Sequence, residues 1–92
     1  MNLEWDDKKN RINILKHGID FNDSPEIFST PILIKLDTRF NYKEKRWIGL
    51  GILKSVVIVV VFTKRGKNLR IISIRKANKI ERKIYNEAIE SN

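Results

Sequence analysis

The residues of this chain that could take part in chemistry are mostly cationic. Its 92 residues include 19 lysines and arginines, 11 aspartates and glutamates, one histidine and no cysteine. Metal-dependent hydrolysis needs a cluster of carboxylates or histidines, and this chain has one histidine and few acids in its back half. Nucleotide binding through a glycine-rich phosphate loop is also unsupported, because no such motif precedes a helix. We therefore expect neither a metal nor another cofactor. Metal-free RNA cleavage needs less, because the 2′-hydroxyl is the nucleophile and the protein supplies a base, an acid and positive charge.

Groups that could transfer a proton in such a reaction are few. The set is Lys9, His17, Glu44 and Tyr85. Histidine titrates near neutral pH without perturbation, but a lone histidine at a helix end is more often a cap that interacts with the helix dipole. Glu44 stands between Lys43 and Lys45 and could form an ordinary loop ion pair.

Arginine is well suited to hold the phosphate, because its guanidinium group can donate two parallel hydrogen bonds to phosphate oxygens. We expect Arg46 and Arg75 to stabilise the transition state. By strand alternation Arg70 and Arg75 lie on opposite faces, so only one of them belongs to a shared site. The wider RNA-binding set is Lys16, Trp47, Lys64, Arg65 and Arg70, and the rings that could stack on bases are Trp5, Tyr42 and Trp47.

The positive charge is unevenly distributed. The net charge is +8, yet residues 1–26 carry four basic and six acidic side chains. Residues 43–83 carry thirteen basic side chains against Glu44 and Glu81. Such a block favours binding to a polyanion such as RNA, although a solvated lysine-rich surface is the alternative interpretation.

Two helices are expected in the first third of the chain. Asp6 or Asp7 can cap a helix over 7–17, and Gly18 can end it. Ile12 and Leu15 would form its apolar stripe, beside a face with Lys9, Asn13 and Lys16. A short second helix would follow residues 22–25, include Ile27 and Phe28, and end at Pro31.

The middle of the chain predicts four strands, over residues 32–36, 46–53, 56–63 and 69–76. Residues 37–45 read as a polar loop, and Lys54-Ser55 as a two-residue hairpin turn. The run from Val56 to Phe62 is apolar at every position, which indicates a central strand covered on both faces. The short connections favour an antiparallel meander.

A closing helix should begin near Asn78, which forms a capping-box pattern with Glu81. The small and apolar residues expected to face the sheet are Ala77, Ile80, Ile84 and Ala88. The expected fold class is α+β, with two N-terminal helices, a four-stranded antiparallel sheet and a C-terminal helix in one domain over residues 1–92. Helices on one face would leave the other face open for function.

The compartment expected from the sequence is the cytoplasm. The N-terminus lacks the basic start and apolar run of a signal peptide, and the longest apolar run has seven residues, against about 20 for a membrane span. The absence of cysteine fits a reducing compartment. No membrane partner is expected.

Three blocks of residues, in order, resemble the BrnT family of toxin–antitoxin toxins. The first is Trp5-Asp6, Lys9, Asn13, Lys16-His17-Gly18-Ile19 and Phe21; the second is Glu44, Arg46 and Gly49 to Gly51; the third is Arg70-Ile71-Ile72-Ser73, Arg75, Ala77, Glu81-Arg82 and Tyr85. The chain departs from the family pattern at Asp7, Lys43 and Ile74. Of these, Lys43 bears most on the role of the neighbouring Glu44.

The resemblance implies a RelE-like fold, RNA cleavage that arrests growth, and neutralisation by a BrnA-like antitoxin with a ribbon-helix-helix-type DNA-binding region. It also implies that promoter DNA is bound only through the toxin–antitoxin complex. The polar positions that match the family are Lys9, His17, Glu44, Arg46, Arg75 and Tyr85. A non-catalytic alternative remains, in which the chain binds nucleic acid or only supports an antitoxin as a promoter co-repressor.

Overall fold

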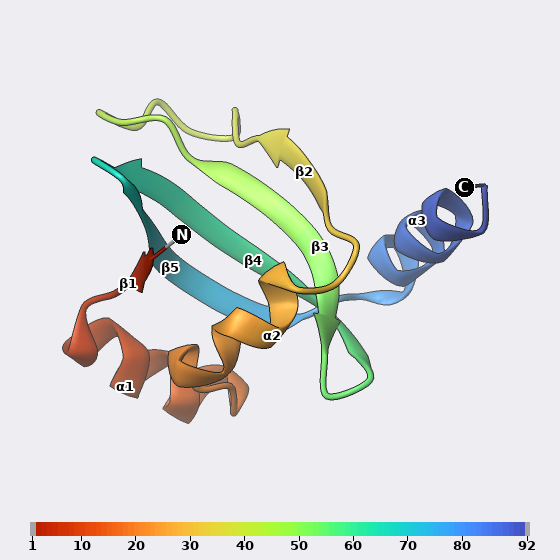
Figure 1. Cartoon of the computed structure of the whole chain (residues 1–92), viewed down its shortest axis with the longest axis horizontal. Coiled ribbons are helices and arrows are strands. Elements are labelled where there is room, and N and C mark those ends of the chain that lie inside the picture. Colours follow the sequence, from red (N-terminus) through yellow and green to blue (C-terminus); the bar gives the residue numbers. More distant parts are fainter. Residues whose placement is uncertain (1, 92) are drawn as a thin grey trace.

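The computed structural model describes residues 2–91. In chain order its elements are β1 (Asn2–Glu4), α1 (Asp7–His17), a 3₁₀ turn (Phe21–Asp23), α2 (Ser24–Phe28), β2 (Leu33–Leu36), β3 (Trp47–Leu53), β4 (Val56–Arg65), β5 (Asn68–Lys76) and α3 (Lys79–Glu90). Figure 1 shows a twisted sheet with α1 and α2 together on one side of it, whereas α3 lies apart from them, at the right of the view.

The expected four-stranded antiparallel sheet is wrong. The strand order is β1-β5-β4-β3-β2, so the sheet has five strands, and β1 pairs with β5 in parallel. The first strand therefore precedes the two N-terminal helices. β1 has only three residues, too few for an alternating pattern to be visible, and its partner lies more than 60 residues along the chain.

The apolar run does form the central strand, as predicted. β4 pairs with β3 on one side and β5 on the other. Ile58, Val60 and Phe62 join the main core beneath the N-terminal helices. The alternate residues Val59 and Val61 lie on the other face and are also buried.

α1 spans the predicted residues, with Asp6 as its N-cap and Gly18 as its C-cap. The side chains that it buries are the amides of Asn10 and Asn13. The Asn13 side chain donates to the Ile74 carbonyl at 2.9 Å and accepts from the Ile74 amide at 3.1 Å. It thereby satisfies the edge of β5 beyond the short β1. The predicted apolar stripe is wrong, because Ile12 and Leu15 are 54% and 87% exposed.

Close packing around the β3–β4 hairpin depends on backbone geometry. Lys54 and Ser55 have φ values of 49° and 68°, which confirms the two-residue turn as type I′. A Cβ atom on Gly49 would lie 2.8 Å from the Ile32 Cδ1 atom. Glycine there lets the chain before β2 approach β3.

α3 has the predicted capping box between Asn78 and Glu81. Its buried residue is Tyr85, whose hydroxyl donates to the Pro31 carbonyl at 2.6 Å. Of the arc predicted to face the sheet, Ala77 is buried as expected, but Ile80 and Ile84 are 71% and 51% exposed, so the prediction is correct only in part. α3 does not join α1 and α2 on their face, because its start is tied instead to Arg75 on the opposite one.

Across residues 2–91, no helix combines the length and hydropathy that a membrane crossing requires. In the same range, no three histidine, cysteine, aspartate or glutamate side chains lie close enough to share a metal ion.

Candidate active site on the open face of the sheet

A β-bulge decides which arginines share a face. We call the side of the sheet away from α1 and α2, which carries Leu50 and Val59, the open face. Arg75 pairs with Val59 and Arg70 with Thr63, two β4 residues of the same parity, because the register shifts at Val61/Phe62. Both arginines therefore lie on the open face. The prediction of opposite faces is wrong, since the bulge adds a residue between them.

Five arginines lie on or over this face, and each is close to a carboxylate. The shortest contacts are Arg39–Asp37 at 2.9 Å, Arg46–Glu44 at 3.7 Å, Arg65–Glu44 at 3.1 Å, Arg70–Glu4 at 2.7 Å and Arg75–Glu81 at 2.8 Å. Four of these arginines were predicted as site residues from the sequence. The carboxylates fix the positions of the guanidinium groups and offset much of their charge.

Glu44 lies between two of the arginines. Its Oε1 atom accepts from Arg65, whereas its Oε2 atom is buried without a hydrogen-bond partner. The Nε atom of Arg46 is also buried and unpartnered, 3.7 Å from that oxygen. A buried polar atom without a hydrogen bond costs free energy, so these two atoms gain if their side chains shift and expose them to a substrate. The arrangement offers a proton acceptor beside fixed cations.

The loop that carries Glu44 is anchored by the buried Asp37. Arg39 donates to both oxygens of this carboxylate through its Nε and Nη2 atoms, and the Tyr42 hydroxyl donates to it at 3.0 Å. The hydrogen bonds from Arg39 hold the pKa of Asp37 far below its usual value. At the other end of the loop, the Thr63 hydroxyl donates to the Lys45 carbonyl at 2.6 Å. The Asp37 amide also donates to the Arg46 carbonyl at 2.7 Å, so the two ends of the loop are joined to each other and the Lys45 end is tied to β4.

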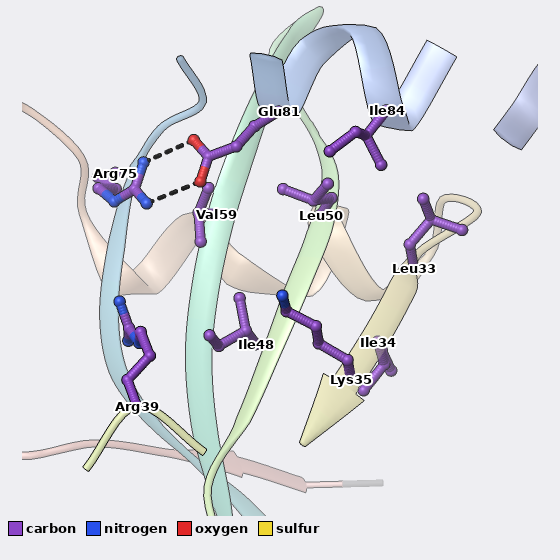
Figure 2. Close-up of a pocket in the computed structure, with 10 residues that line it drawn as sticks. All are labelled: Leu33, Ile34, Lys35, Arg39, Ile48, Leu50, Val59, Arg75, Glu81 and Ile84. Atoms are coloured by element: carbon purple, nitrogen blue, oxygen red, sulfur yellow. Dashed lines mark hydrogen bonds and ion pairs between the residues drawn. The ribbon is translucent and has the colours of Figure 1, made fainter. Parts of the chain in front are cut away.

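A groove of about 280 Å³ lies between the open face and α3. Figure 2 shows its apolar side chains extending towards one another from β2, β3, β4 and α3; they are Leu33, Ile48, Leu50, Val59 and Ile84. Arg75 and Glu81 close one side with paired hydrogen bonds of 2.8 and 2.9 Å. Glu81 raises the pKa of Arg75, and Arg75 lowers the pKa of Glu81. Both ends of the Arg75 guanidinium are therefore occupied.

Two predicted RNA-binding residues lie on the other face. Trp47 pairs with Phe62 in the ladder and stacks on its ring at 6.2 Å. The Lys64 ammonium lies 5.7 Å from the centre of the Trp47 ring. Because alternate strand residues face opposite sides, both point away from Arg46 and Arg65.

Tyr85 is also apart from the arginines. It is 2% exposed, and its hydroxyl is bound to the Pro31 carbonyl. Burial raises the pKa of this tyrosine. Its position anchors α3 to the chain before β2.

The predicted residues of α1 form a separate group. Lys9 and Lys16 are exposed and His17, the last residue of the helix, is partly exposed. Asn13, expected beside the two lysines on a phosphate-binding face, is buried against β5. Among the hydrogen bonds and ion pairs described for residues 2–91, none joins this group to Glu44 or Arg46.

The sequence interpretation missed Asp37, Arg39 and Glu4 as parts of the site. Glu4 accepts from Asn68 and Arg70, and these contacts lower its pKa. Its partners are more than 60 residues away in the chain, so no local pattern indicates them. The Asp37-x-Arg39 spacing was the one available signal, and it lies in a segment that reads as an ordinary polar loop.

A family model described as "Ribonuclease toxin, BrnT, of type II toxin-antitoxin system" matches residues 5–81. The match covers most of the chain, including the loop with Glu44, the five-arginine face and the start of α3. A search of individually curated proteins found no match.

Proposed function

Because the chain belongs to the BrnT family of ribonuclease toxins of type II toxin–antitoxin systems, we propose that it cleaves RNA without a metal ion at Glu44, Arg46 and Arg65. A family of this type has an RNA target and an antitoxin partner. The reaction would then take place at the end of the open face that lies next to the loop over residues 37–45.

In this mechanism the 2′-oxygen attacks the adjacent phosphorus and Glu44 accepts the hydroxyl proton. Arg46 and Arg65 bind the non-bridging oxygens, where negative charge builds in the transition state. The bond to the 5′-oxygen then breaks, and this oxygen takes a proton from water or a protonated side chain. The products are a cyclic phosphate and a free 5′-hydroxyl. Guanidinium groups supply the positive charge that a metal would otherwise provide.

The observation that carries the proposal is the environment of Glu44. One carboxylate oxygen is hydrogen-bonded by Arg65, and the other makes no hydrogen bond but lies 3.7 Å from the Arg46 Nε atom, which also makes none. The side chains of Glu44 and Arg46 are 31% and 24% exposed, so the pair borders solvent. Arg75, predicted to assist Arg46, has both guanidinium ends on Glu81, and we assign it to anchoring α3.

The test is cleavage of RNA in excess chelator by wild type, Glu44→Gln and Arg46→Ala, with melting temperature measured on the same samples. We expect wild type to retain activity, Glu44→Gln to lose about 10²–10⁴-fold and Arg46→Ala about 10²–10³-fold in rate. Lys54→Asn is the charge-matched control, because Lys54 lies at the opposite end of the β3–β4 hairpin and asparagine tolerates its positive φ. Loss of wild-type activity in chelator, or full activity of both folded variants, would contradict the proposal.

We further propose that the antitoxin inhibits by occupying the groove beside α3. Ile84 is half exposed in the groove beside the apolar side chains of Leu33 and Leu50, and a partner would bury it. Lys35 and Arg39 add positive charge at the groove, which suits an antitoxin segment with apolar and acidic side chains. A segment bound there would also obstruct access to the neighbouring arginines.

Binding of the co-expressed antitoxin to Ile84→Asp should be at least tenfold weaker, while RNA cleavage by the free variant is unchanged. Leu15→Asp, on exposed α1, is the matched control and should bind normally. Equal antitoxin affinity for Ile84→Asp and wild type would place the interface elsewhere.

Promoter binding is the remaining part of the proposal. We expect the chain alone to give no specific shift of promoter DNA, and the antitoxin complex to give one. A complex that shifts promoter DNA around a chain that never cleaves RNA would favour the non-catalytic co-repressor alternative.

A further inference from the structure

Phe40 is an exposed aromatic residue beside the proposed active site. It is 67% exposed, although exposure of a phenyl ring to water is unfavourable. Its ring meets Tyr42 edge-to-face, with 5.8 Å between ring centres and 68° between planes. The Phe40 ring is therefore oriented by a neighbour while much of its surface remains free.

The contact with Tyr42 leads directly to the catalytic group. The Arg46 guanidinium lies 4.2 Å from the centre of the Tyr42 ring. Tyr42 itself is engaged by this cation–π contact and by Asp37, which leaves Phe40 the more exposed of the two rings. Phe40 is the outermost member of a series of rings and cations that ends at Arg46.

The exposure of Phe40 is set by a constrained loop. Asp37 binds Arg39 through backbone and side chain and also binds the Tyr42 hydroxyl, so the residues on both sides of Phe40 are tied to one buried carboxylate. A fixed ring loses little conformational entropy when a ligand stacks on it. The loop thus presents a preorganised apolar surface.

The surroundings of the ring favour a nucleic acid over a protein partner. Residues 37–46 carry Arg39, Lys43, Lys45 and Arg46, and their two carboxylates, Asp37 and Glu44, are both bound by arginines. Protein hot spots lie in dry, well-packed apolar pockets, whereas single-stranded nucleic acid is bound by aromatic rings among cations. Phe40 has the second kind of environment.

We propose that Phe40 is the stacking platform for a nucleobase of the RNA next to the scissile phosphate. The assignment rests on the proposed function and adds a base subsite to it. A phenyl ring has no hydrogen-bonding group, so it contributes affinity for any base, with larger purines gaining more contact area than pyrimidines.

The test measures binding, so that it does not depend on turnover. In a Glu44→Gln background, a short RNA with 2-aminopurine is titrated with Phe40, Phe40→Ala and Phe40→Trp proteins. For the proteins with Phe40 and with Phe40→Trp, we expect the 2-aminopurine fluorescence to be quenched on binding. For Phe40→Ala we expect roughly 10–100-fold weaker binding and no quenching. An RNA with an abasic residue at the stacked position should bind both Phe40 and Phe40→Ala equally weakly.

Leu15→Ala, which removes an exposed apolar side chain on α1, is the control and should leave binding unchanged. Equal RNA affinity of Phe40→Ala and Phe40 would overturn the inference, and so would a loss of antitoxin binding with RNA binding intact. If the wild type fails to cleave RNA while Phe40→Ala weakens binding, the proposed function fails and the base subsite stands. Because Phe40 is exposed, its substitution should leave the melting temperature within about 2 °C.

Discussion

Arg75 and Arg46 both face the open side of the sheet, but their guanidinium groups are engaged differently. Both terminal nitrogens of Arg75 donate hydrogen bonds to Glu81, whereas the Arg46 Nε atom makes no hydrogen bond and lies 3.7 Å from Glu44. We expect Arg75→Ala to lower the melting temperature through loss of the tie to α3 and to leave cleavage per folded molecule nearly unchanged. Arg46→Ala should lower cleavage per folded molecule and leave the melting temperature nearly unchanged. Activity and melting curves on the same samples check this; a 10²-fold rate loss in folded Arg75→Ala would return that arginine to the catalytic group.

Asp37 is the residue whose charge holds the loop over residues 37–45. Its folded-state pKa is lowered by Arg39, so its contribution to stability is present above the unfolded value of about 4 and is lost as pH falls towards the folded value. Asp37→Asn should destabilise by about 1–3 kcal/mol at pH 7, because two charge-assisted bonds are lost. Its destabilisation relative to wild type should shrink below pH 4. A constant difference from pH 7 to pH 3 would contradict this account.

At the residue scale, the sequence identified arginines better than it identified their partners. Residue type and family resemblance made Glu44, Arg46, Arg70 and Arg75 candidates, and Arg65 stood in the wider RNA-binding set; the structure brings these four arginines to one face. Strand alternation alone separates Trp47 from Arg46, because neighbouring residues of a strand face opposite sides. The buried role of Asp37 depends on where the loop folds, which no local pattern specifies.

Helix α1 is held to β5 mainly by an amide. Asn13 is 5% exposed and makes three hydrogen bonds, two with Ile74 and one with the Ile19 carbonyl. Asn13→Ala should cost about 2–4 kcal/mol, because it leaves buried backbone groups unsatisfied. Leu15→Ala, on the same helix, should change stability by less than about 0.5 kcal/mol. Denaturant unfolding measures both, and equal stabilities would show that solvent replaces the amide.

The element boundaries were predictable where a local signal exists. The Asp6 cap and Gly18 define α1, and the seven-residue apolar run defines β4. The faces of the helices were not predictable, because Asn13 buries a polar side chain and leaves Leu15 in water. The bulge between Arg70 and Arg75 was also invisible, since it arises from the pairing of two strands.

Over the whole molecule, the open face is less positive than the net charge of +8 suggests. Its five arginines lie close to four carboxylates: Glu4, Asp37, Glu44 and Glu81. Much of the uncompensated charge therefore comes from lysines. The electrostatic field over such a face is modest. We therefore expect it to recognise phosphate groups through the placement of its guanidinium groups and not through its total charge.

The salt dependence of RNA binding distinguishes binding by the arginines of the open face from binding by the whole cationic block of residues 43–83. Each phosphate contact to single-stranded nucleic acid contributes about −0.7 to the slope of log K against log salt. Contacts limited to Arg46, Arg65 and Arg70 predict a slope of about −2, whereas engagement of all thirteen cations of residues 43–83 predicts about −9. We expect the shallow slope. Titration of a short RNA with the Glu44→Gln protein between 50 and about 300 mM salt measures it.

Two variants sharpen the salt test. Arg65→Ala should move the slope towards zero by about 0.7 and weaken binding to all RNA sequences alike, because a phosphate contact carries no base information. Lys54→Asn removes the same charge from the far end of the hairpin and should leave the slope unchanged if only the arginine face meets RNA. If both variants shift the slope equally, the lysine-rich surface as a whole attracts RNA. Binding would then be diffuse, and the arginines of the open face would have no special part in it.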